Sequence, residues 1–289
     1  MALIRRLTPV DDEFPQLLLE TKDIPAFLTV LGSLPQGCAI AVVGSRKPSV
    51  YARRMTRRVA AGLAEAGVIV VSGLARGIDT AAHEAALDAG GITWAVLGSG
   101  LKRIYPSENA KLAQRIVAGG GAILSQFEPA VGPSRHHFPM RNKIVSGLCL
   151  GVVVVEGTGQ SGSLITARSA ADQSREVMCV PGPVDTPSGE AVYRLLRDGA
   201  TPVRNAEDVL EHLGLQSTPL GGSLNLTNEE EGATVAEYKI LELLGSNSLT
   251  IEELIGETGY NLPHLLSLLS YMEGKGSIVP VAGQGYARS

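Results

Sequence analysis

Short apolar runs alternate with helical segments over residues 38–213, and this alternation limits the possible folds more than any other feature of the chain. Strands are expected at Ala39–Val43, Val68–Val71, Ile92–Leu97, Ala122–Leu124, Leu150–Val155 and Glu176–Val180. Helices are expected near Tyr51–Ala66, Thr80–Ala89, Ser107–Ala118 and Leu164–Gln173. Connections of this kind are right-handed crossovers. The pattern therefore predicts an α/β fold with an extended Rossmann-like, doubly wound and mostly parallel sheet, covered on both faces.

Composition changes along the chain predict the domain organisation. Residues 1–35 favour a short helical lead-in that packs on a main domain at 36–214. Residues 215–232 are rich in Gly, Ser, Asn and Thr, which is typical of a linker. Residues 233–289 have three helical periodicities followed by a hairpin pattern, so we expect a small C-terminal winged-helix domain.

Charge is distributed unevenly along the 289 residues. From Thr227 onward the sequence contains nine Glu and three basic residues, which gives a net charge of −6. The preceding residues therefore carry a net charge of +2, since the total is −4. The third expected helix of the tail, Leu262–Met272, contains no Lys or Arg. Because a helix that enters a DNA groove needs basic or amide side chains, we expect this winged helix not to bind DNA, and instead to contact protein or to dock on the main domain.

The sequence offers no sign of a membrane, disulfide or metal-binding protein. No apolar run reaches the roughly 20 residues that span a bilayer, and the N-terminal residues do not resemble a signal peptide. Three widely spaced cysteines without a Cys-x-x-Cys pattern favour neither a disulfide framework nor a zinc site. His136 and His137 lack a third partner at metal-ligand spacing. We expect a cytoplasmic protein with no membrane association and no metal.

Three glycine loops each follow an expected strand. They are Gly44-Ser45-Arg46, the loop from Ser72 through Gly73, Arg76 and Gly77, and Gly159 to Ser163. Such loops direct backbone N–H groups and a helix N-terminus at an anion. Two of the loops also carry an arginine, which favours one long polyanionic ligand. Asp79 follows the second loop and could cap the next helix or orient Arg76.

The third loop matches two enzyme motifs only in part. Gly157 to Gly162 reads G-x-G-x-x-G, but it comes late in the sheet, and the acid expected to hold a ribose, Asp185, lies beyond a Pro-Gly-Pro break. The G-x-S-x-G pattern fails because Ser163 replaces the last glycine. We therefore expect a tight turn whose helix N-terminus remains able to bind a phosphate through Gly162 and Ser163, with no cofactor and no catalytic set.

The segment Arg135–Lys143 is the densest basic stretch, and it includes Phe138, Arg141 and Asn142. Arg and Lys neutralise phosphates while an aromatic face stacks a base, so binding is favoured over a solvated loop with Phe138 turned inward. Four arginines, Arg53, Arg54, Arg57 and Arg58, have helical spacing. They favour a solvated face or a supporting positive field.

The motifs together resemble the DNA-processing protein A family. They are Gly44-Ser45-Arg46, Ser72–Asp79, Gly98–Gly100 with Tyr105-Pro106, Phe138–Ile144, and Ser161–Arg168 followed by Val180-Pro181-Gly182. The resemblance implies a homodimer that binds single-stranded DNA and helps load the RecA recombinase during natural transformation. It implies no established catalysis. By position, Arg46, Lys143, Gly162-Ser163 and Phe138 are the foremost DNA contacts, and Arg76, Arg141, Asn142 and Arg168 are secondary ones.

An enzyme of a related Rossmann family is the first alternative, and a dinucleotide-dependent oxidoreductase and a protein-interaction scaffold with a vestigial DNA site are the others. A nucleotide phosphoribohydrolase that resembles lysine decarboxylase would carry a Pro-Gly-Gly-x-Gly-Thr loop, which Glu156 to Gly159 match only in part. The favoured hypothesis has single-stranded DNA across the carboxyl edge of the sheet. Glycine-loop amides, Arg46 and Lys143 would hold the phosphates, and a base would stack near Phe138.

Overall fold

The computed structural model describes residues 3–215 continuously. Beyond them it describes residues 240–241, 243–244, 248–258, 265–266, 268–269, 272–273, 277–281 and 285–288. The chain forms two compact units, residues 1–226 and 227–289. The linker predicted at 215–232 lies outside the described residues, apart from Leu215.

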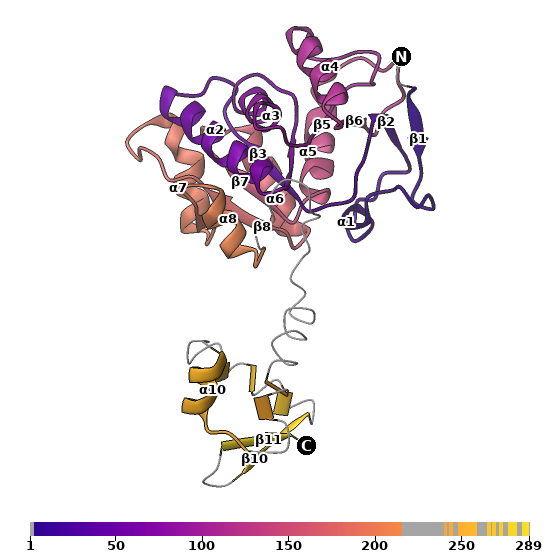
Figure 1. Cartoon of the computed structure of the whole chain (residues 1–289). Helices are drawn as coiled ribbons and strands as arrows, with labels where there is room; N and C mark the ends of the chain where they lie inside the picture. Colours follow the sequence, from indigo (N-terminus) through magenta and orange to yellow (C-terminus); the bar gives the residue numbers. More distant parts are fainter. Residues whose placement is uncertain are drawn as a thin grey trace. The chain divides into compact units, whose positions relative to one another are not determined.

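The larger unit contains a nine-stranded sheet in the order β1-β2-β6-β5-β4-β3-β7-β8-β9 (Figure 1). The strands are β1 (Arg5–Leu7), β2 (Leu28–Gly32), β3 (Ala39–Val43), β4 (Ile69–Ser72), β5 (Thr93–Val96), β6 (Ala122–Ser125), β7 (Gly151–Val154), β8 (Glu176–Cys179) and β9 (Thr201–Pro202). Neighbouring strands from β6 to β9 pair in parallel. The mostly parallel α/β sheet predicted from the sequence is confirmed.

Helices cover both faces of this sheet. They are α1 (Gln16–Leu19), α2 (Val50–Glu65), α3 (Ile78–Asp88), η1 (Ser107–Asn109), α4 (Ala110–Ala118), α5 (His137–Gly147), α6 (Gly162–Asp172), η2 (Pro187–Gly189), α7 (Glu190–Arg197) and α8 (Ala206–His212). Ile40 and Val42 of β3 pack with α2, α3 and α8, and the alternate residues Ala41 and Val43 pack with α5, α6 and α7. Because strand side chains alternate between faces, β3 must be apolar throughout.

The strand order has a switch point between β3 and β7. The chain proceeds from β3 outward through β4, β5 and β6, and then returns to place β7 on the other side of β3. The loops that leave β3 and β7 therefore diverge at the carboxyl edge. Ligands of open α/β sheets bind in the crevice that this divergence opens.

Two parts of the larger unit differ from the sequence prediction. The lead-in at 1–35 is helical only at α1, because β2 pairs antiparallel with β6, β1 pairs antiparallel with β2, and both strands extend the sheet. The basic segment at 135–143 is not a loop, since most of it forms the first two turns of α5. The second difference places Phe138 and Arg141 on a helix, where packing fixes their direction.

The smaller unit contains α10 (Ile251–Thr258) and a hairpin of β10 (Ile278–Val281) and β11 (Gly285–Arg288). Its core consists of buried apolar side chains: Ile240, Leu244, Leu254, Leu265, Leu268, Leu269, Met272 and Ile278. The predicted middle helix and hairpin are present. The other two expected helices fall partly outside the described residues. No helix in the described part of the chain combines the length and hydrophobicity that a bilayer crossing requires.

We expect Gly77→Ala to destabilise the protein more than Gly90→Ala. Both glycines have positive φ, 83° at Gly77 and 75° at Gly90. A Cβ at Gly77 would lie 2.3 Å from the Ser45 carbonyl oxygen, whereas a Cβ at Gly90 would meet no atom within 4 Å. Gly90→Ala should therefore lower the free energy of unfolding by only about 1–2 kcal/mol, the cost of positive φ for a residue with a Cβ. Gly77→Ala should lower it by more, because the added Cβ also clashes. Urea unfolding measures both, and equal losses would show that the loops do not meet as described.

Candidate nucleic-acid interface

The loop after β4 is held from within by Asp79. This buried carboxylate accepts hydrogen bonds from the N–H groups of Gly73 at 3.1 Å and Ala75 at 3.3 Å. Burial raises the pKa of Asp79, while the nearby Arg141 guanidinium and the loop amides act in the opposite direction. These two N–H groups therefore already donate to a carboxylate of the protein. The expectation that the glycine-loop amides hold phosphates does not apply to them.

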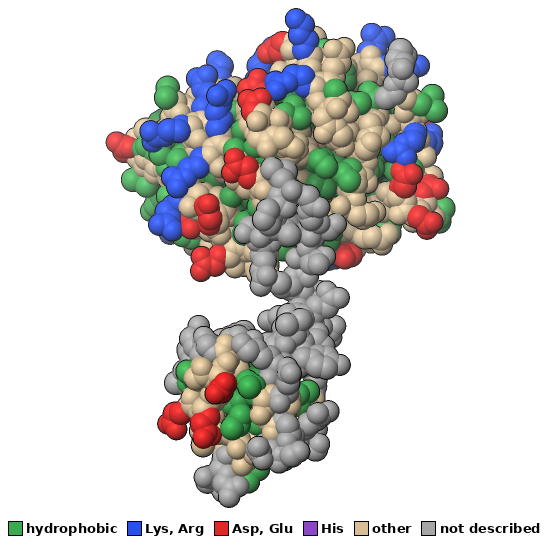
Figure 2. Space-filling view, viewed as in Figure 1, with side chains coloured by type: hydrophobic (Ala, Val, Ile, Leu, Met, Phe, Trp, Pro, Cys, Tyr) green, Lys and Arg blue, Asp and Glu red, His purple; other side chains and the backbone are tan. Residues whose placement is uncertain are grey.

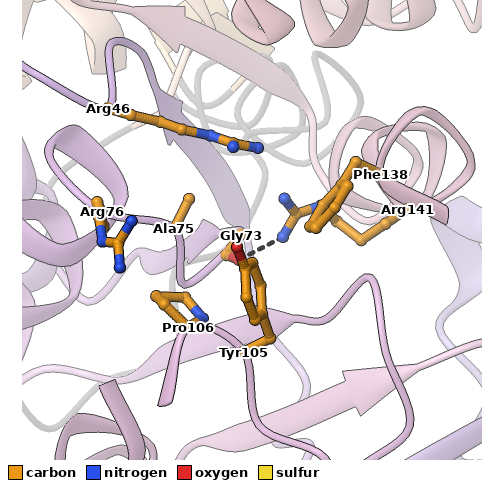
Figure 3. A pocket seen from close by; sticks show the side chains of 8 residues that line it. All are labelled: Arg46, Gly73, Ala75, Arg76, Tyr105, Pro106, Phe138 and Arg141. Carbon is orange, nitrogen blue, oxygen red and sulfur yellow. Dashed lines mark hydrogen bonds between the residues drawn. The ribbon is translucent and has the colours of Figure 1, made fainter. Parts of the chain in front are cut away.

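Arg141 of α5 forms the floor of the site. Its side chain is almost fully buried, and its Nη1 donates to the carbonyl oxygens of Gly73 and Val96, which follow β4 and end β5. The hydrogen bond to Gly73 is drawn in Figure 3. A Cβ at Gly73 would overlap the guanidinium, which explains the glycine. Arg141 thus ties α5 to two strand ends and organises the loops that follow them.

Above this floor lies a pocket with aromatic and cationic walls (Figure 3). Arg46 reaches across it toward Phe138, with its guanidinium carbon 5.3 Å from the ring centroid. Tyr105 faces Phe138 at a centroid distance of 6.0 Å, with the rings tilted by 53°. Tyr105 is 43% exposed and Phe138 is half-buried. The pocket therefore offers two aromatic rings and a cation to an incoming flat group.

Arg76 lies at the rim of the same pocket, but its charge is already paired. Its Nε and Nη2 donate to the Glu108 carboxylate at 2.5 Å and 2.7 Å, and both side chains are exposed. The pair raises the pKa of Arg76 and lowers that of Glu108. Glu108, not Asp79, is the carboxylate that orients Arg76.

A wider groove extends from the pocket over the loops after β3 and β7. Asn142 contributes to it and donates from Nδ2 to the Gly162 carbonyl at 3.2 Å, which links α5 to the start of α6. Ser161 accepts from the N–H of Ser163 and caps α6. The groove brings together most of the predicted contacts: Gly44, Ser45, Arg46, Gly73, Phe138, Arg141, Asn142, Gly162 and Ser163.

The remaining predicted residues lie elsewhere. Gly77 lines a neighbouring groove between α2 and α3. Lys143 is not among the lining residues, and its Nζ pairs with Asp23 at 2.8 Å. Arg168 is exposed on α6 and is likewise absent from the lining. Arg46 differs from Arg76 and Lys143 because it has no ion-pair partner among the described residues.

Sequence reasoning did not single out Tyr105 or Lys47 as site residues and included Arg135 only within the basic segment, although all three line the groove. Arg135 begins the basic segment, and Lys47 follows the Gly44-Ser45-Arg46 loop, so charge next to a candidate loop could have revealed both. Tyr105 does not directly follow a strand, and the residues around it show no helical or strand periodicity. Its Tyr105-Pro106 motif carried the resemblance, and this was the available signal.

The fold and the site define a doubly wound α/β protein with a cationic, aromatic-lined groove at the carboxyl edge of its sheet. Comparison with known proteins then identifies the family. Residues 5–214 match the family model of DNA recombination-mediator protein A. The chain belongs to this family, so the resemblance noted from the motifs is confirmed.

Individual relatives agree. Protein Smf of Escherichia coli K12 is 40% identical over 288 residues, which is 98% of this chain and 77% of Smf. The DNA processing protein DprA of Bacillus subtilis is 40% identical over 204 residues, 70% of this chain and 68% of that protein. The X-ray structure of DprA from Streptococcus pneumoniae matches with a TM-score of 0.68 and 40% identity, covering 72% of this chain and 74% of that one.

Proposed function

We propose that this protein binds single-stranded DNA in the groove at the carboxyl edge of its sheet. The observation that carries the proposal is the pocket formed by Arg46, Tyr105 and Phe138. Bases of a single strand stack on aromatic rings, and a cation beside them neutralises the phosphates. Bases inside a duplex are already stacked on one another, so this pocket favours a single strand. Contacts to phosphates carry no sequence information, which suits capture of any strand.

A relative supports this proposal. The structure of DNA processing protein A from Helicobacter pylori, described by its single-stranded DNA binding mode, matches with a TM-score of 0.65 and 29% identity. The match covers 74% of this chain and 98% of the Helicobacter pylori chain. We extend the proposal to the role that the family resemblance implies. The protein would act as a homodimer that captures incoming DNA during natural transformation and delivers it to the RecA recombinase.

The proposal describes a binding protein and not an enzyme. The test is a fluorescence-anisotropy titration of labelled oligo-dT across a salt series, with release of free base from nucleoside monophosphates measured in parallel. Binding should weaken with salt by about 0.7 log units of affinity per phosphate contact for each log unit of salt. Absence of oligo-dT binding at low salt together with base release would instead establish the phosphoribohydrolase alternative.

We assign DNA binding to the larger unit. The first turn of α10 carries Glu252 and Glu253, which suit a helix N-terminus but repel phosphates. The smaller unit is therefore proposed to contact protein.

We expect Glu108→Gln to strengthen oligo-dT binding. The substitution removes the carboxylate that pairs with Arg76 and so releases the Arg76 guanidinium at the pocket rim. One additional phosphate contact corresponds to about a fourfold gain at about 0.15 M salt and a salt slope steeper by about 0.7. The double variant Glu108→Gln/Arg76→Gln is the control, and it should lose the gain. A gain that persists in the double variant would show that Arg76 does not reach the strand.

A further inference from the structure

Helix α2 presents a row of arginines that packing does not require. Arg53, Arg54, Arg57 and Arg58 are all exposed. The opposite side of the helix is buried in the core through residues that include Ala52, Met55, Val59 and Leu63. Figure 2 shows Lys and Arg side chains gathered over the region where α2 and α7 lie. The row is therefore a feature of the surface.

The position of these arginines also opposes the helix that carries them. Ser49 caps α2 by accepting from the N–H of Ala52, and no acidic residue lies in the first turn. Arg53 and Arg54 fall within the first five residues, near the positive end of the helix dipole, where cations are unfavourable. The helix dipole thus does not favour Arg53 and Arg54, whereas an anion bound at this end of α2 would stabilise both.

A groove between α2 and α3 collects part of this charge. Its charged lining residues are Arg46, Lys47, Arg53, Arg57 and Glu84. Glu84 is the one carboxylate among these residues, and it lies 3.6 Å from Arg57. Four cationic side chains thus face a single acid. The α2–α3 groove shares Arg46 and Lys47 with the wider groove that extends from the Phe138–Tyr105 pocket, which we call the aromatic groove. The two surfaces are therefore continuous.

We propose that single-stranded DNA leaving the aromatic groove passes Arg46 and Lys47 and continues along the α2–α3 groove, where Arg53 and Arg57 bind its phosphates. This inference rests on the proposed function, because the strand enters from the base pocket. It adds a second phosphate-binding segment to the site. The protein then gains affinity with strand length beyond what the aromatic groove alone can hold.

The test compares two lengths of labelled oligo-dT, about 6 and about 15 nucleotides, within the range that single-strand binding folds cover. The full chain carries Arg53→Gln/Arg57→Gln. Affinity for the long strand should fall about tenfold at about 0.15 M salt, and its salt slope should become flatter by about 1.4. Affinity for the short strand should stay within about twofold, because the short strand does not reach Arg53 and Arg57. It therefore lacks the two phosphate contacts, each of which contributes about 0.7 to the salt slope.

The matched control is Arg115→Gln/Arg197→Gln, which removes the same charge from exposed arginines in the last turns of α4 and α7. This control should leave both lengths unaffected. An equal loss for both lengths in the α2 variant would overturn the path and leave a general positive field. No loss for either length would also overturn it. If the wild type binds neither strand, the proposed function fails first and this inference fails with it.

Discussion

Arg46→Glu should lower the affinity for oligo-dT by more than about tenfold at about 0.15 M salt. The substitution removes one phosphate contact and places a negative charge in the groove, and the affinity of single strands depends steeply on such charges. Arg46 reaches across the pocket toward the Phe138 ring, and no described carboxylate neutralises it. Anisotropy titration across a salt series measures the effect, and the salt slope should become flatter by at least about 0.7.

Lys143→Glu is the matched control for Arg46→Glu. The sequence motifs predict both residues as foremost DNA contacts. In the structure, however, Lys143 pairs with Asp23 and does not line the groove. Its reversal should therefore cost less affinity. If Lys143→Glu lowers affinity as much as Arg46→Glu, the strand does not follow the groove described here, and the path must cross α5 toward Asp23.

Arg141→Met should reduce the free energy of unfolding by about 2–5 kcal/mol, because two buried carbonyl groups would each lose their donor at a cost of about 1–3 kcal/mol. The Asp79 carboxylate would stay buried without its cationic neighbour, and the Gly73 and Val96 carbonyls would lose a donor. Urea unfolding monitored by circular dichroism measures the loss.

Arg168→Met is the control for Arg141→Met, since this arginine of α6 is exposed. It should change stability by no more than about 0.5 kcal/mol. Asp79→Asn combined with Arg141→Met should recover part of the loss, because the buried carboxylate near Arg141 is then replaced by a neutral amide. Full stability in Arg141→Met alone would contradict the assignment of Arg141 as the residue that holds the loops.

The central sheet was predictable because its strands are buried on both faces. Val152, Val153 and Val154 are all fully buried, so the run had to be continuously apolar, and such a run is visible in a sequence. The glycine loops were predictable for a related reason. Gly73 and Gly77 approach Arg141 and Ser45 too closely for a side chain, and glycine is the residue that permits this.

Long-range pairing limited the rest of the prediction. Arg76 and Arg46 look alike in sequence, yet Glu108 neutralises one and no described carboxylate neutralises the other. The burial of Arg141 depends on the ends of β4 and β5, and no local pattern encodes that. The lead-in was read as helical because its short strands β1 and β2 are recognisable only by their pairing with each other and with β6.

The most direct test of the central claim is photocrosslinking of iodouracil-substituted oligo-dT to the full chain, followed by peptide mapping of the adducts. A base held in the pocket lies between rings from two separate segments, so adducts should appear on Phe138 and on Tyr105. Excess unlabelled oligo-dT should suppress both adducts, and Arg46→Glu should weaken them. Adducts confined to residues 227–289, or spread over the sheet edge at β1 and β2 without Phe138 and Tyr105, would contradict the account.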